Sequence, residues 1–301
     1  MSTGSWSTSA FTSYTVNTKC VSDVAEFTTK TYSNAQELYK QRELSPILNP
    51  YKVMRECRDC ESHPATIPVI LALDVTGSMG GASVKVAQKL GDIMSALYDD
   101  SDIKDVEFCT MAIGDVGCDT YPVQISQFEA DIRIAEQLDL VYFEGHGGGN
   151  NYESYSVAWY MGLNHCDLDC WKRGKKGIII TMGDECPNPH LPKDKINKFI
   201  GDSLQCDVET EKLYEEVSEK YDVYHISIDD DETCYKYHND AHNADMKWEK
   251  LLGNNFSVCT LDNLADKIIS IVKAKAMEQQ DGSSLGQPIN SDYSGIGTIS
   301  W

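Results

Sequence analysis

The sequence has few basic residues and no long hydrophobic run. Lysine and arginine together number 26 against 47 aspartates and glutamates, which gives a net charge of −21 over 301 residues. A surface of that sign repels phosphate, so we expect neither a nucleic acid nor an anionic membrane surface as a partner. No apolar run approaches the roughly 20 residues that a membrane-spanning helix needs. The partners that such a surface attracts are cations and proteins with basic faces.

The first ten residues are rich in Ser and Thr and lack the basic and apolar stretches of a signal peptide. We therefore expect a cytoplasmic protein whose 11 cysteines are reduced thiols. Two cysteine pairs have the spacing of zinc ligands, Cys57 with Cys60 and Cys166 with Cys170, and a histidine stands near each pair. Because nothing in the sequence brings the two pairs together, a zinc site stays an alternative to ordinary buried cysteines.

From Thr66 onwards, apolar strand-like runs alternate with amphipathic helical patterns. Residues 67–73 and 177–182 are apolar at nearly every position, which indicates strands that are buried on both faces. Strands that are joined by helices in this way form parallel sheets. The sequence therefore predicts an α/β, Rossmann-like fold with a mostly parallel central sheet and helices on both faces.

The composition divides the chain into three parts. Residues 1–65 form an N-terminal arm, which we expect to pack on the main domain, with an added edge strand as one arrangement. We expect its first 30 or so residues to be irregular or to hold short strands, whereas residues 34–43 favour a short helix. Residues 66–278 form the α/β domain. Residues 279–301 are polar and rich in Gly and Ser, which predicts a flexible C-terminal tail.

The most unusual residues follow the first buried strand directly, in the stretch DVTGS at 74–78. Ligands of doubly wound sheets bind at the carboxyl ends of the strands, which is where this loop must lie. Asp74, Thr76 and Ser78 alternate, so their three oxygens can converge on one side of an extended turn. Carboxylate and hydroxyl oxygens suit a hard cation such as Mg²⁺. Capping of the following helix is the simpler explanation, but it uses only one of the three side chains.

This loop resembles the D-x-S/T-x-S motif of a von Willebrand factor A (vWA) domain, where it forms part of the metal-ion-dependent adhesion site (MIDAS). Two later loops are similar to the other parts of that site and occur in the family's order. One is the glycine-rich stretch that leads to Asn150, Asn151 and Glu153, and the other is Asp184-Glu185 after the second all-apolar run. The resemblance covers about residues 66–277 and implies a vWA domain of the intracellular type.

The resemblance also implies a ligand set and a function. A Mg²⁺ or Mn²⁺ ion would be held by five side chains, with three further ones in a supporting role or as alternate ligands. The five are Asp74, Thr76, Ser78, Asn150 and Asp184, and the three are Asn151, Glu153 and Glu185. In the family, a carboxylate of a partner protein completes the coordination of the ion. The implied function is metal-dependent protein binding by an adaptor or assembly subunit, and an AAA+ ATPase is one partner that the family admits.

We expect no enzyme, because the loops pair no nucleophile with a general base. The alternative is an α/β hydrolase with Ser78 as the nucleophile in a degenerate G-x-S-x-G turn. Its acid would be Asp184 or Asp229, and its histidine would be His225, His238 or His242. Tyr152 and Tyr155 lie close to the second loop, and we expect them on a rim that faces the partner.

Overall fold

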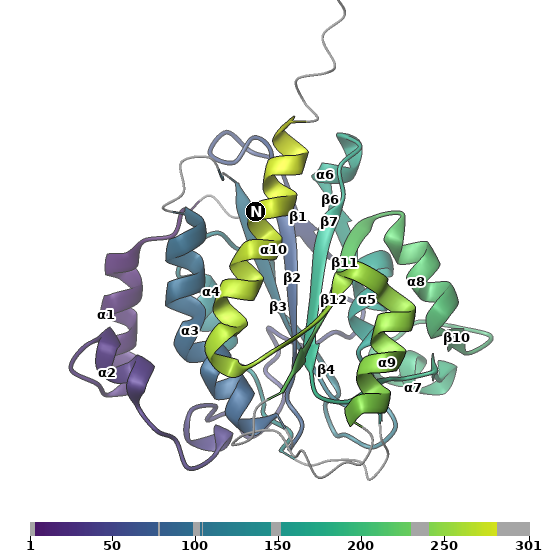
Figure 1. The fold of residues 1–301 in the computed structure, drawn as a ribbon, viewed down its shortest axis with the longest axis horizontal. Helices are drawn as coiled ribbons and strands as arrows, with labels where there is room; N and C mark the ends of the chain where they lie inside the picture. The colour runs from purple at the N-terminus through teal and green to yellow at the C-terminus, as the bar shows by residue number, and fades with distance from the viewer. Residues whose placement is uncertain are drawn as a thin grey trace, which may run out of the picture.

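The protein is described by a computed structural model that covers residues 4–77, 79–98, 103, 105–145, 152–229 and 241–281. Its centre is a six-stranded sheet in the order β12-β11-β7-β2-β3-β4 (Figure 1). The five strands from β12 to β3 run parallel, and β4 is antiparallel to β3. Their bounds are Ile67–Asp74 for β2, Val106–Ile113 for β3, Val123–Ile125 for β4, Gly177–Gly183 for β7, Tyr221–Ile228 for β11 and Phe256–Cys259 for β12.

Helices cover both faces of this sheet. One face carries α3 (Gly80–Tyr98), α4 (Arg133–Leu138) and α10 (Leu261–Asp281). The other carries α5 (Ser156–Asn164), α8 (Thr210–Ser218) and α9 (Ala241–Leu252) (Figure 1). The predicted α/β, Rossmann-like fold with a mostly parallel central sheet is therefore confirmed.

The alternation of side chains along β2 shows why its run has to be apolar throughout. Val69, Leu71 and Leu73 pack into the core under α3 and α10, whereas Ile70 and Ala72 pack into the core under α5. Successive side chains of a strand point to opposite faces of the sheet. A strand that is covered on both sides therefore has no polar position until it ends, and β2 ends at Asp74.

The N-terminal arm packs on the domain, but it does so with helices. Helix α1 spans Thr8–Lys19 and α2 spans Val24–Thr29, where an irregular or strand-containing arm was expected. Phe11 and Phe27 are buried in the core shared with α3. Gly91 of α3 makes room for this contact, because a Cβ there would lie 2.3 Å from the Phe11 ring. A glycine inside a helix costs stability, and here it is offset by the burial of an aromatic ring.

The described residues of the arm, 4–65, add no edge strand to the central sheet, which corrects the arrangement considered above. Its strand β1 (Arg55–Cys57) pairs with β6 (Cys166–Leu168) in a separate two-stranded sheet. Two further small sheets pair β5 (Tyr152–Glu153) with β8 (Cys186–Pro187), and β9 (His190–Leu191) with β10 (Val208–Glu209). The short elements that remain are α6 (Asp169–Lys172), α7 (Lys193–Phe199) and the 3₁₀ turns Ala35–Glu37 and Gly253–Asn255.

At the C-terminal end, α10 continues to Asp281, which is three residues into the segment predicted as a flexible tail. The rest of that segment, residues 282–301, lies outside the described residues. None of the helices in the described part of the chain combines the length and the apolar character needed to cross a membrane.

Candidate functional site

The loops that follow β2 and β7 lie side by side at the carboxyl edge of the sheet. The two strands are neighbours, and Leu73 is in register with Met182. Asp74 is the next residue on β2, and Asp184 comes directly after the last residue of β7. The fold therefore brings together two of the predicted metal ligands that are 110 residues apart in the sequence.

Asp74 is fully buried and is held in place by three hydrogen bonds. Its Oδ1 accepts from the backbone N–H of Thr76 at 2.8 Å and from the Thr76 hydroxyl at 2.6 Å. Its Oδ2 accepts from the hydroxyl of Tyr155 at 2.7 Å. Donors of this kind stabilise the charged form of a buried carboxylate. The loop predicted from DVTGS thus fixes the orientation of its first acid through its own second polar residue.

The Tyr155 hydroxyl is a part of this site that the sequence analysis did not find. We expected Tyr155 on an exposed rim, but its side chain is fully buried, because it follows the second loop at the start of α5 and packs under the sheet. Its oxygen also accepts from the backbone N–H of Glu185 at 3.3 Å, so it joins the first and third loops. Gly183 leaves the space for it, since a Cβ there would lie 1.9 Å from the Tyr155 oxygen.

The second tyrosine of the expected rim is placed differently. Tyr152 has 39% of its surface exposed and lines a cavity of about 840 Å³ together with Pro187, Tyr214 and Leu251. The ammonium group of Lys247 stands 5.8 Å from the centre of the Tyr152 ring. Tyr152 is therefore available for contact with a partner.

Three further acids lie in loops that the sequence did not connect with the site, and one of them, Asp119, interacts electrostatically with Asp74. Asp115 and Asp119 lie in the turn after β3, where Oδ2 of Asp119 accepts from the backbone N–H of Asp115 at 2.7 Å. Glu144 accepts from the backbone N–H groups of the same turn, at Thr120 and Tyr121. All three acids are buried. Their only sequence signal was position, since each stands near the end of a strand or before the glycine-rich loop.

Glu153, which was predicted as a supporting or alternate ligand, is buried in the same region. The short sheet between β5 and β8 holds it, with Glu153 in register with Pro187. Its Oε2 has no hydrogen-bond partner among the described residues. An unpaired carboxylate oxygen in a buried position is costly unless it is protonated or bound to a cation.

The electrostatics of the cluster follow from burial and from like charge. Burial, followed by the charge of Asp184, raises the pKa of Asp74 to about 7, and the hydrogen bonds from Thr76 and Tyr155 oppose that rise. Burial also raises the pKa of Asp119 to about 7, with Glu144 and Asp115 as the nearest repelling charges. Burial and the charge of Asp74 raise the pKa of Glu153 far above its usual range. Positive charge at this edge would relieve all three shifts.

Two of the five predicted ligands, Ser78 and Asn150, and the supporting or alternate ligand Asn151 lie outside the described residues. Within the described ranges there is no group of three or more His, Cys, Asp or Glu side chains arranged to hold a metal ion. The ligand set predicted from the sequence contains two carboxylates, Asp74 and Asp184, and otherwise uses hydroxyl and amide oxygens, so it does not depend on such a group.

The cysteines of the zinc alternative lie in or shortly after β1 and β6. Pairing of β1 with β6 brings the two cysteine segments side by side, with Cys57 in register with Leu168. Cys57, Cys166 and Cys170 are buried thiols, and burial raises the pKa of each. They do not form a metal-holding group with the neighbouring histidines or acids of the described ranges. His165 instead contacts the carbonyl of Val53 and the carboxylate of Asp202.

For the hydrolase alternative, His225 is the only candidate histidine whose side chain the structure describes, since the side chains of His238 and His242 lie outside it. The His225 ring is fully buried in β11 and stacks on Trp248 with 3.7 Å between ring centres. Its Nδ1 lies 2.8 Å from the hydroxyl of Thr181. This histidine is a packed core residue.

Comparison with known proteins gives similarity at the level of the fold. No protein-family model matches the sequence, and no curated protein matches it. Among solved structures, the pilus adhesin SpaC from Lactobacillus rhamnosus GG in its open conformation matches with 12% identity and a TM-score of 0.46, over 76% of this chain and 31% of SpaC. The chain thus spans about a third of the length of SpaC.

Two other solved structures give similar values. The vWF domain of the type V pili tip protein Mfa5 from Porphyromonas gingivalis matches with 11% identity and a TM-score of 0.45, over 76% of this chain and 99% of that domain. Proximal thread matrix protein 1 from the mussel byssus matches with 11% identity and a TM-score of 0.46, over 71% of this chain and 48% of that protein. Identities this low concern the arrangement of the chain and say nothing about a bound group.

Proposed function

We propose that this chain is a vWA-type domain that binds Mg²⁺ or Mn²⁺ at the carboxyl ends of β2 and β7, and that a carboxylate of a protein partner completes the site. The observation that carries this proposal is the meeting of two acids, Asp74 and Asp184, at the carboxyl ends of neighbouring strands, where burial and the charge of Asp184 raise the pKa of Asp74. A divalent cation bound between two carboxylates neutralises their mutual repulsion and gains both as ligands.

The donors fit such an ion. Asp74 offers a carboxylate fixed by Thr76 and Tyr155, and Asp184 offers a second one from the neighbouring strand end. Ser78 and Asn150 are assigned to the ion from the vWA resemblance alone. With two full negative charges from the ligands, the ion would keep Lewis acidity toward a third carboxylate. Bound there, the ion would supply a positive charge that attracts and orients the partner's side chain.

The residues around the ligands would hold this site in shape. Tyr155 fixes Oδ2 of Asp74, and Gly183 admits the tyrosine to that position. Hydrogen bonds to ligating carboxylates typically change metal affinity by about 10- to 100-fold. An adaptor or assembly role, with an AAA+ ATPase among the candidate partners, follows from the family resemblance.

The test is calorimetric titration of Mg²⁺ and of Mn²⁺ into the wild-type chain, Asp74→Ala and Asp184→Asn. Asp92→Ala is the matched control, because Asp92 is an exposed acid on α3 that pairs with Lys89. We expect one saturable site in the wild type and in the control, no saturation with Asp74→Ala, and an affinity about 10- to 100-fold weaker with Asp184→Asn. Circular dichroism and thermal melting show that each variant is folded.

A further titration repeats the experiment with millimolar acetate as a stand-in for the partner's carboxylate. Binding that appears only with acetate agrees with a site that the partner completes. A folded wild type that binds neither ion with or without acetate contradicts the proposal, and so does a folded Asp74→Ala variant that binds as tightly as the control.

A further inference from the structure

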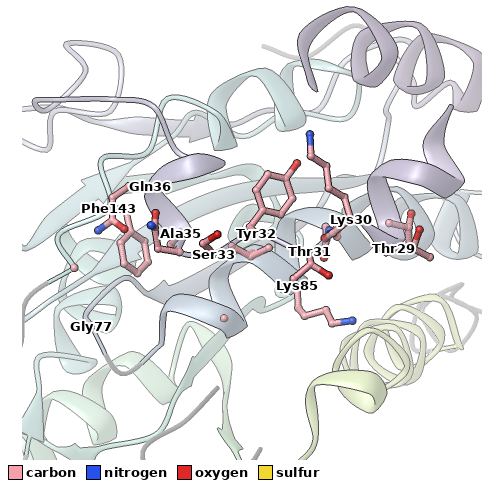
Figure 2. Close-up of a pocket in the computed structure, with 16 residues that line it drawn as sticks. Thr29, Lys30, Thr31, Tyr32, Ser33, Ala35, Gln36, Gly77, Lys85 and Phe143 are labelled. Carbon is pink, nitrogen blue, oxygen red and sulfur yellow. The ribbon is translucent and has the colours of Figure 1, made fainter. Parts of the chain in front are cut away.

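A groove of about 600 Å³ lies between the N-terminal arm and the first turns of α3 (Figure 2). One wall is residues 28–36 of the arm, which we call the strap, and the opposite wall is formed by Val84, Lys85 and Gln88 of α3. The Gln88 amide donates to the carbonyls of Phe27 and Lys30, at 2.7 and 2.8 Å, and so ties the strap to the helix. The groove is therefore built into the fold.

One end of the groove meets the proposed metal site. Gly77 of the first metal loop lines it, and so does Gly145, which precedes the glycine-rich loop. The backbone N–H of Gly145 donates to the carbonyl of Val75 at 3.3 Å, which holds the two loops together. In Figure 2 the strap crosses the hollow from Thr29 to Gln36, with the Gly77 loop at the Gln36 end and Lys85 near Lys30 and Thr31.

The charge of the groove is opposite to that of the rest of the chain. Among the described residues its lining holds two lysines, Lys30 and Lys85, and no acid, although the chain carries 47 aspartates and glutamates. The Lys30 ammonium stands 5.3 Å from the ring centre of Tyr32, on the opposite side of the strap from Lys85 in Figure 2, and it interacts with the exposed Glu26. Among the described residues Lys85 has a distant partner in Asp262, at 3.9 Å and 88% exposed. Exposed acids bind a lysine only weakly, so both lysines can accept a new carboxylate.

The strap also offers its backbone. It has extended, non-helical backbone between α2 and the 3₁₀ turn at Ala35–Glu37. The N–H and C=O groups of Thr31 and Tyr32 have no hydrogen-bond partner within the described part of the chain. An exposed segment with unpaired backbone groups can pair with an extended peptide, with the hydrogen bonds supplying affinity and the adjoining side chains supplying specificity.

We propose that the groove binds an extended acidic stretch of the protein partner, next to the carboxylate that reaches the metal. This rests on the proposed function, and it adds a second recognition element that is independent of the metal. Lys85 lies five residues into α3, or about 8 Å along the helix at 1.5 Å per residue. An extended peptide covers about 3.3 Å per residue, so the acidic side chains should stand two to four residues from the metal-binding one.

The experiment is a selection from a displayed peptide library in which a central aspartate is flanked by four random residues on each side. It is run on the full chain with Mg²⁺ and again with EDTA. The same selections are made on Lys30→Gln/Lys85→Gln and on the control Lys89→Gln/Lys198→Gln, whose lysines are exposed or partly exposed and do not line the groove. Melting curves check that all three proteins are folded.

We expect enrichment of Asp and Glu on one side of the fixed aspartate, two to four residues away, with the wild type and the control. We expect that enrichment to be lost with Lys30→Gln/Lys85→Gln, and selected peptides to bind this variant about tenfold more weakly. Acidic enrichment that persists in the double variant, or its absence from the wild type under both conditions, overturns the proposal. Lysine-dependent enrichment that is equal in EDTA supports the groove and counts against the metal site.

Discussion

Glu107 near the amino end of β3 should make the chain less stable as the pH rises. Its side chain is 1% exposed, and neither carboxylate oxygen has a hydrogen-bond partner in the described part of the chain. Burial raises its pKa from 4.5 to about 7, and the neighbouring Cys57 thiol and His63 oppose this only in part. A raised pKa in an acid means that the folded state holds the proton more tightly than the unfolded state does.

The size of the effect follows from the two pKa values. Below pH 4.5 the group is protonated in both states and costs nothing. At pH 5 the shift costs about 1 kcal/mol of stability, and at pH 8 it costs about 3 kcal/mol, because the cost grows with pH until the folded chain has released the proton as well. Glu107→Gln removes this titration. The stability of the variant relative to the wild type should therefore be about 2.5 kcal/mol more favourable at pH 8 than at pH 5.

The assay is urea unfolding of both proteins at pH 5 and pH 8, followed by circular dichroism. The amide's own burial cost of roughly 1–3 kcal/mol does not depend on pH, so it cancels in the comparison between the two pH values. Glu136→Gln is the control, because Glu136 is an exposed acid on α4. Parallel stability profiles for wild type and Glu107→Gln would refute the reasoning, since they would mean that Glu107 titrates normally in the folded state.

Two further predictions test the site and the arm. Gly183→Ala should displace Tyr155, destabilise the chain by about 1–3 kcal/mol and weaken Mg²⁺ binding. The control is Gly174→Ala, at φ +68° with no atom within 4 Å of the added Cβ, which should cost only a backbone strain of about 1–2 kcal/mol and leave Mg²⁺ binding unchanged. Calorimetry and urea unfolding measure both, and equal Mg²⁺ affinities in the two variants would count against the role given to Tyr155. Phe27→Ala should cost about 3–5 kcal/mol in urea unfolding, because the ring is 2% exposed in the core under α3. A loss below about 1 kcal/mol would mean that the arm is not part of the folded unit.

The sequence predicted the centre of the sheet well because β2 and β7 are buried on both faces. A strand of that kind is apolar at nearly every position, which leaves a signal that needs no knowledge of its neighbours. The predicted strands at 67–73 and 177–182 are each one residue short at their carboxyl ends. The missing residues are Asp74 and Gly183, where the apolar pattern stops and the site begins.

The arm was predicted poorly for the opposite reason. Helix α1 is rich in Thr and Ser and buries only Phe11 and Thr15, so its sequence shows no apolar stripe. Its stability comes from the contact of Phe11 with α3, and the glycine that permits the contact is at position 91. For α2 a local signal was present, since Asp23 caps the helix and Glu26 accepts from the Ser22 backbone N–H.

The sequence by itself therefore determined which segments form the buried strands and where the first acid of the site stands. Apolar periodicity and the DVTGS loop are local properties of the chain. Only the tertiary structure decided which other side chains surround that acid. Tyr155 donates to Asp74 from the start of α5, the charge of Asp119 acts on Asp74 from the turn after β3, and the alternation of β2 turns Asp74 toward the face on which α5 lies. Contacts of that kind depend on how strands and helices pack, and no short stretch of sequence contains that information.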